Sequence, residues 1–245
     1  MHLLLLLVFV ALPLAKLVLT VAWPGLLKRL EGRRTEAHLV SQFGAIQRDT
    51  RVSQVGQKLL AGSTLAARFG VLPGPIKNAV ALPNGRILLW EGLIEMAGDD
   101  TDMLAGVLAH ELGHLKHEHF LNRVQWAAMA SFILGYLGGG WARRFIQNLA
   151  ATAISRGFSR RQELEADDTA VHLMRRAGYD PAGLARLLDQ LDDGSAPGSL
   201  MGTHPDPAAR ASRIRKKLGL SPKPRAAKKA APAPPSNVLP FPGRK

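Results

Sequence analysis

Two histidines and a glutamate occur in a spacing that suits metal-assisted hydrolysis. The run HELGH occupies residues 110–114, inside a stretch that we predict to form one helix over residues 101–119. His110 and His114 lie on one helical face, about one turn apart, so both imidazoles can reach one tetrahedral zinc ion. Glu111 lies at the edge of that face, where it can take a proton from metal-bound water and pass it to a leaving amine. The HExxH pattern therefore predicts a zinc-dependent peptidase.

A catalytic zinc needs a third protein ligand and one open position. The chain has no cysteine, so this ligand must be a histidine or a carboxylate, and the acidic run at residues 163–168 is the best source. Glu163 and Asp167 share a helical face, so one could bind zinc while the other accepts an N–H from a ligand histidine. Glu165 points roughly the other way. A solvated charge run is the alternative reading, but the HExxH upstream leads us to favour Glu163.

The elements that position these residues are expected to be mainly helical. Acidic and capping residues before Thr101 favour a helix start there. Apolar residues three or four apart predict amphipathic helices within residues 35–70. Two more helices are expected, over residues 160–177 and 181–191, the first ending at Gly178.

A short hairpin is predicted before the HExxH helix. Asn84-Gly85 stands between two apolar runs, which is a strong hairpin signal, with strands near residues 78–82 and 86–90. The predicted fold class is therefore α+β, mainly helical, with a small antiparallel sheet.

The N-terminal region has the character of a membrane anchor. Residues 3–23 are apolar except for Lys16, match the thickness of a bilayer, and are followed by a basic cluster at residues 28–34. We predict an uncleaved transmembrane helix over residues 1–24 rather than a secretory signal, which would carry a basic start and a short apolar core. The positive-inside rule then places the catalytic domain in the cytoplasm, with a periplasmic or other extracytoplasmic location as the alternative.

The remaining chain divides into a peptidase domain over residues 25–220 and a disordered basic tail over residues 221–245. Within the domain, residues 124–155 are apolar and Gly-rich, which suits either a buried helical hairpin or a segment that dips into the membrane. The net charge is +13, and the basic groups beside the apolar N-terminal segment suggest attraction to anionic lipid. Nucleic acid is not expected as a partner, because no aromatic-interleaved basic motif or zinc-finger spacing occurs.

Four stretches resemble one family of membrane-associated zinc metallopeptidases. ALPNGRILLWEGLIEM, VLAHELGHLKHEH, SRRQELEAD and THPDPAAR occur in the order of the HtpX/BepA-like family, which includes the CAAX prenyl proteases, and cover about residues 75–215. The resemblance implies a gluzincin-type domain in which Glu163 is the third zinc ligand and Asp167 supports a ligand histidine. It also implies catalytic roles for His204 and Arg210, with His204 beside the zinc, either stabilising the oxyanion or occupying the open position at rest.

The same resemblance implies that polypeptide substrates bind extended along an edge strand, here Arg86–Trp90. Spacing alone would make His204 an exposed histidine in a turn. His117 and His119 are expected to be solvated at a polar helix end, and neither is assigned to zinc.

The leading hypothesis is a membrane-anchored zinc metalloendopeptidase in protein quality control, cleaving misfolded or damaged polypeptides with Glu111 as general base. One alternative is a narrow-specificity processing protease of the same fold. Another is a zinc-binding chaperone or scaffold without turnover, although such a protein would typically lose Glu111. A basic, lipid-tethered adaptor acting through its tail is the last alternative.

Overall fold

The computed structural model of this 245-residue chain describes residues 24–122, 158–191 and 204–221. The expected N-terminal anchor, the Gly-rich apolar segment and the basic tail lie outside these residues, apart from Pro24 and Ser221. Within the described part of the chain, no helix combines the length and the apolar content that crossing a bilayer requires.

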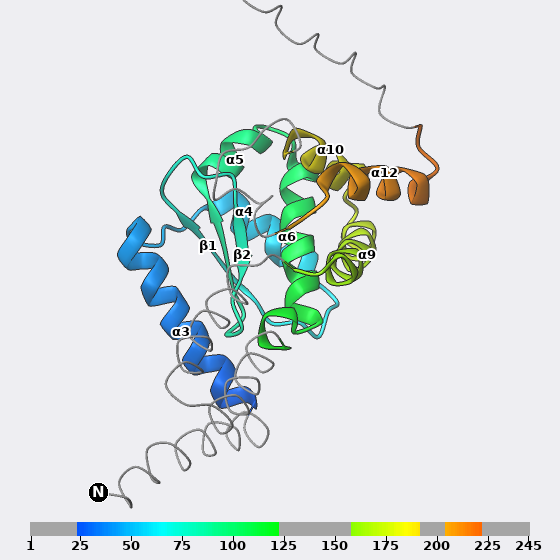
Figure 1. Ribbon diagram of the computed structural model, residues 1–245. Helices are drawn as coiled ribbons and strands as arrows, with labels where there is room; N and C mark the ends of the chain where they lie inside the picture. Colours follow the sequence, from blue (N-terminus) through cyan, green and yellow to red (C-terminus); the bar gives the residue numbers. More distant parts are fainter. Residues whose placement is uncertain (1–23, 123–157, 192–203, 222–245) are drawn as a thin grey trace, which may run out of the picture.

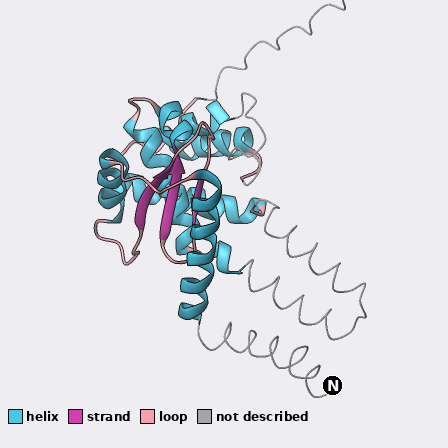
Figure 2. Cartoon of the chain, turned by 90° about the vertical axis from the view of Figure 1, so that its left-hand side faces the viewer, coloured by secondary structure: helices cyan, strands magenta, loops and turns pink. Residues whose placement is uncertain are grey.

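The described residues form seven helices and three strands, which Figure 1 labels. In chain order they are α3 (Pro24–Phe43), α4 (Thr50–Leu60), β1 (Arg68–Leu72), β2 (Ala79–Ala81), β3 (Arg86–Trp90), α5 (Glu91–Ala97), α6 (Thr101–Lys116), α9 (Arg160–Arg176), α10 (Ala182–Leu191) and α12 (Pro207–Leu218). The mainly helical α+β class is confirmed, and the strands lie between helices in the view of Figure 2.

The sheet is mixed rather than antiparallel. Its order is β1-β3-β2, with β2 antiparallel and β1 parallel to β3. The predicted hairpin is confirmed, because β2 and β3 pair across the turn at residues 83–85. The prediction of an edge strand at Arg86–Trp90 is wrong: β3 is the central strand, and both of its edges carry ladder hydrogen bonds.

β1 is the reason for this difference. Residues 35–70 were expected to be helical, but α3 ends at Phe43, where Gly44 takes a φ of +100°. Asp49 then caps α4, which ends at Leu60, and the chain turns back as β1. The partner of β1 lies 18 residues away in the sequence, so no local hairpin signal could reveal the pairing.

The sheet packs helices on both faces, as the alternation of strand side chains requires. Ile87 and Leu89 of β3 belong to the main core, with α4, α6, α9 and α10. Leu88 and Trp90 point to the other face, where they form a smaller cluster with Phe43 and neighbouring side chains of α3.

α6 is the central element of the domain. It lies between the sheet and α9 in Figure 1. Asp100 is its N-cap, and its side chain accepts a 3.0 Å hydrogen bond from the Met103 amide. The helix ends at Lys116, three residues before the predicted end, and a turn follows in which Glu118 has a φ of +53°.

Candidate metal centre

α6 buries the whole HExxH run. His110, Glu111 and His114 are 1–2% exposed, although all three are polar. Groups of this kind are buried when they have partners or bind a metal. The partners come mainly from α9, which crosses α6 at close range.

α9 is fixed at its start by a capping box. The Ser159 side chain accepts from the Gln162 amide, and the Gln162 side chain accepts from the Ser159 amide. Gly113 of α6 allows the close approach, because a Cβ at that position would lie 2.7 Å from the Ala166 carbonyl oxygen. The result is that Glu163 and Asp167, both fully buried, face the two histidines of α6.

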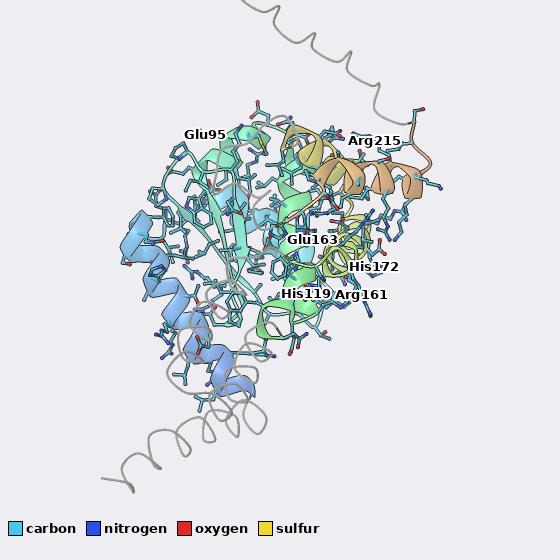
Figure 3. All side chains as sticks on the ribbon, in the orientation of Figure 1. Glu95, His119, Arg161, Glu163, His172 and Arg215 are labelled. Atoms are coloured by element: carbon cyan, nitrogen blue, oxygen red, sulfur yellow. The ribbon has the colours of Figure 1, made fainter. Side chains whose placement is uncertain are left out.

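The side chains predicted to bind metal converge on one point. Nε2 of His110 and Nε2 of His114 lie 3.0 Å apart. The two carboxylate oxygens of Glu163 each lie 3.4 Å from one of these nitrogens, Oε2 from that of His110 and Oε1 from that of His114. Glu163, labelled in Figure 3, belongs to α9 and lies against α6. Three residues from two helices therefore present two nitrogens and a carboxylate to one small volume.

His204 completes this group from the segment before α12. Its Nδ1 lies 3.2 Å from Nε2 of His110 and 3.0 Å from Glu163, and its Nε2 lies 3.6 Å from Glu111. It is 2% exposed, so the turn that Thr203-His204-Pro205 suggested does not leave it in solvent. The ligand atoms of His110, His114, Glu163 and His204 all lie within 4.8 Å of one another.

Arg210 of α12 lies behind the group and is also 2% exposed. It donates to both carboxylate oxygens of Asp167, at 2.9 and 2.7 Å, and its Nη1 lies 2.6 Å from Glu163. Asp167 in turn lies 3.0 Å from Nδ1 of His110. The arginine thus holds two buried carboxylates at once.

The electrostatics of the group favour a cation between its carboxylates. Burial and Arg210 would lower the pKa of His110, but hydrogen bonds to Asp167 and Glu163 raise it to about 9. Burial would raise the pKa of Asp167, yet hydrogen bonds from Arg210 and His110 lower it to about 2. Against its burial, the neighbouring histidines hold the pKa of Glu163 far below its usual range. Burial drives the pKa of His114 well below 6.5, so its imidazole is neutral and available as a ligand.

These residues fit a catalytic zinc ion. Two imidazole nitrogens and a carboxylate are a common ligand set for such an ion. The Nε2 atoms of His110 and His114, which lie 3.0 Å apart, can both bind one shared cation. Glu111 supplies a further sign, because its Oε1 is buried without a hydrogen-bond partner among the described residues.

One residue of this region was misjudged from the sequence. His119 was expected to be solvated, but it is 3% exposed and its Nδ1 lies 2.9 Å from Nδ1 of His114. Helical periodicity could not reveal this contact, because the turn at Glu118 redirects the chain. His117 is partly buried and contacts Thr169 at 2.9 Å.

Comparison with known proteins agrees with the metal-binding geometry described above. The model of peptidase family M48 matches residues 46–218, which include every residue of the group. Metalloprotease LoiP of Escherichia coli (strain K12) is 34% identical over 150 residues, 58% of this chain and 58% of LoiP. Mitochondrial metalloendopeptidase OMA1 of Arabidopsis thaliana is 31% identical over 140 residues, 55% of this chain and 28% of OMA1. The beta-barrel assembly-enhancing protease of Escherichia coli (strain K12) is 27% identical over 154 residues, 56% of this chain and 31% of that protein. The matched part of each relative is less than two thirds of its length.

Proposed function

The chain belongs to peptidase family M48, a family of zinc metalloendopeptidases, and from that premise we propose that it hydrolyses peptide bonds with one zinc ion. The observation that carries the proposal is the convergence of His110, His114 and Glu163 beside Oε1 of Glu111, a buried oxygen with no hydrogen-bond partner among the described residues.

In this proposal His110, His114 and Glu163 hold the ion. Zinc bound there would act as a Lewis acid and would lower the pKa of a bound water to about 7. Glu111 accepts the proton of the attacking water and delivers it to the leaving amide nitrogen. Its buried oxygen, free of hydrogen bonds to other described residues, is available for both transfers.

His204 and the Asp167–Arg210 pair have supporting roles. His204 lies between the ligand group and Glu111, where its imidazole can donate a hydrogen bond to a carbonyl oxygen that becomes negative during attack. Asp167 accepts from Nδ1 of His110 and so directs Nε2 of that ring toward the ion. Arg210 is a positioning residue, because it contacts the carboxylates of Asp167 and Glu163 from behind.

The substrate is proposed to be an extended polypeptide that binds along β2. Among the described residues this strand pairs with β3 on one side only, and its ladder bonds involve Asn78 and Leu82. By alternation, the backbone groups of Ala79 and Ala81 point away from β3. Ala81 also lines one hollow with His114. Replacing Ala81 by proline removes an outward donor, so KM should rise, and an unchanged KM would exclude this binding mode.

Recognition through the backbone suits unfolded chains of many sequences. We therefore propose a role in protein quality control, with the domain tethered to a membrane by residues 3–23. Cleavage of unfolded casein should be faster than cleavage of folded membrane proteins. Selective cleavage of one folded protein would support narrow processing instead.

Glu111→Gln tests the mechanism in the full-length protein. The amide keeps the shape of the side chain but cannot accept the proton, so casein hydrolysis should fall by about 10²- to 10⁴-fold. Zinc content should stay at one ion per chain. Hydrolysis at the original rate would refute the role of Glu111.

Glu163→Ala tests the ligand set, and Glu95→Ala is the control because Glu95 is exposed on α5. Metal analysis of the purified protein should show zinc lost with Glu163→Ala and retained with Glu95→Ala. Full zinc content in both variants would contradict the assignment.

A further inference from the structure

A line of four side chains leads from the candidate metal centre to the surface of α9. His119 follows α6, and its Nδ1 lies 2.9 Å from Nδ1 of His114. Its Nε2 lies 3.3 Å from Oε2 of Glu165, whose Oε1 accepts a 2.9 Å hydrogen bond from Nε of Arg161. His119 and Arg161 are labelled at the same end of the α6–α9 pair in Figure 3.

We infer that His119 is a positioning residue that fixes the tautomer of His114 and leaves Nε2 of His114 free to bind zinc. This inference rests on the proposed function, because it concerns how a proposed ligand is held. It adds a residue to the site that the HExxH pattern does not contain.

The inference follows from where the protons must be. A histidine that binds zinc through Nε2 carries its proton on Nδ1, and that proton needs an acceptor. Nδ1 of His119 is the acceptor in place at 2.9 Å. It can accept only when the proton of His119 is on Nε2, and Glu165 is the acceptor for that proton. Glu165 thus sets the tautomer of His119, which sets the tautomer of His114.

The other HExxH histidine is held in a parallel way. Nδ1 of His110 lies 3.0 Å from Asp167, which is paired with Arg210. Nδ1 of each histidine of the motif is therefore connected by hydrogen bonds to a carboxylate that is paired with an arginine. For His110 the contact is direct, and for His114 it passes through one imidazole.

The backbone supports a specific role for His119. Glu118 is one of two described non-glycine residues with a positive φ, at +53°. An L-residue is strained in this conformation, and such strain often occurs at functional sites. The turn redirects the chain after Lys116, and the residue it places against His114 is His119, five positions later.

The same side chains allow a rival arrangement. His117, His119 and Glu165 are close enough to hold a second cation. A cation on Nε2 of His119 would leave the proton of that ring on Nδ1, facing the proton on Nδ1 of His114. Two donors would then meet at 2.9 Å. While His114 binds zinc through Nε2, the geometry favours the hydrogen-bonded line.

The test uses two replacements of similar shape in the full-length protein. In His119→Asn, the amide oxygen can stand near the place of Nδ1 and accept, whereas His119→Leu offers no acceptor. Zinc affinity is measured by competition with a chelator. We expect His119→Leu to weaken zinc binding about 10- to 100-fold and His119→Asn to retain most of it. The visible absorption bands of the cobalt-loaded protein should shift in the Leu variant and stay near those of the wild type in the Asn variant.

The exposed His172 of α9 provides the control, since His172→Leu and His172→Asn should both bind zinc as the wild type does. Equal affinity of His119→Leu and wild type, or equal losses in Leu and Asn, would overturn the inference. If His119→Leu does not fold, Glu165→Leu replaces it as the test, because Glu165 is partly exposed. Glu165→Leu must then weaken zinc binding, and an unchanged zinc affinity would also overturn the inference.

Two further outcomes separate the inference from its premise. If His114→Ala binds zinc as tightly as the wild type does, the proposed ligand set is refuted, and the inference with it. Normal dependence on His114, together with a second cobalt equivalent that His117→Ala removes, would refute only the inference and support the rival cation site.

Discussion

A single buried arginine holds the negative charges of the site together. Arg210 contacts both carboxylate oxygens of Asp167 and also Glu163, and all three side chains are at most 2% exposed. A buried charge left without its partner is strongly destabilising, whereas a surface ion pair contributes little. Arg210 therefore stabilises the fold before any ion is bound.

Replacing this arginine should expose that role. Arg210→Met should lower the free energy of unfolding by about 3–5 kcal/mol in the presence of a chelator. Saturating zinc should restore part of the loss, because a ligand that binds only the folded state stabilises it. Urea unfolding with and without zinc measures both effects. Arg213→Met is the control, since Arg213 and its partner Asp168 are both partly exposed, and a similar loss there would contradict the argument.

Helix contacts decide whether the ligands meet at all. Gly113 lies in the HExxH run, and a Cβ there would come within 2.7–2.8 Å of the backbone of Ala166 on α9. Gly106, two turns earlier on α6, has a similar contact with the backbone of Leu184 on α10. Both glycines allow close packing, but only the first faces the helix that carries Glu163.

Gly113→Ala and Gly106→Ala should consequently differ. Both should lower the unfolding midpoint, because the facing backbone has to shift. Gly113→Ala should also weaken zinc binding, because the added methyl group would push α9 away and would move Glu163 away from His110 and His114. Chelator competition on the two variants measures this. Equal zinc affinities would show that α9 does not set the ligand geometry through this contact.

The sequence predicts the local parts of this arrangement and misses the nonlocal ones. The i, i+4 spacing of His110 and His114, and of Glu163 and Asp167, follows from helix geometry alone, and the structure brings these residues together. The pairing of β1 with β3 depends on distant backbone, so β3 was mistaken for an edge strand. The burial of His119 depends on one residue with positive φ, which periodicity does not encode.

The N-cap of α6 gives this helix a dependence on pH. The hydrogen bond with Arg186 holds the pKa of Asp100 below its ordinary 3.8. A lowered folded-state pKa means that the stabilisation is present above pH 3.8 and is lost as the pH falls through the folded value. Asn caps helices about as well as Asp but carries no charge.

Asp100→Asn should therefore be slightly less stable than the wild type at neutral pH, by less than about 1 kcal/mol because the pair is partly exposed. The difference should shrink as the pH falls below 3.8 and vanish once Asp100 is protonated in the folded protein. Unfolding midpoints measured across this range test the sign. A difference that grows on acidification would be the wrong sign for this ion pair.

At the scale of the whole molecule, α3 connects the apolar N-terminal segment to the site. Lys28 forms an ion pair with Glu118, next to His119, and Asn84 of the hairpin donates to Glu36. Leu26 and Leu30 are exposed on the first turns of α3, among basic residues that anionic lipid attracts. The contacts of α3 hold the start of the domain against the end of α6.

Removal of residues 1–23 should for this reason change where the enzyme works rather than whether it works. The shortened protein should cleave soluble unfolded casein at the rate of the full chain, because the proposed substrate strand β2 begins at Ala79 and the proposed metal-binding and catalytic residues lie within residues 110–210. Its binding to vesicles that contain anionic lipid should fall, and so should cleavage of an unfolded substrate tethered to those vesicles. Co-sedimentation and cleavage assays on both proteins measure this, with Glu111→Gln as the inactive control. An equal loss on soluble and tethered substrate would mean that the segment is needed for the fold of the domain rather than for its location.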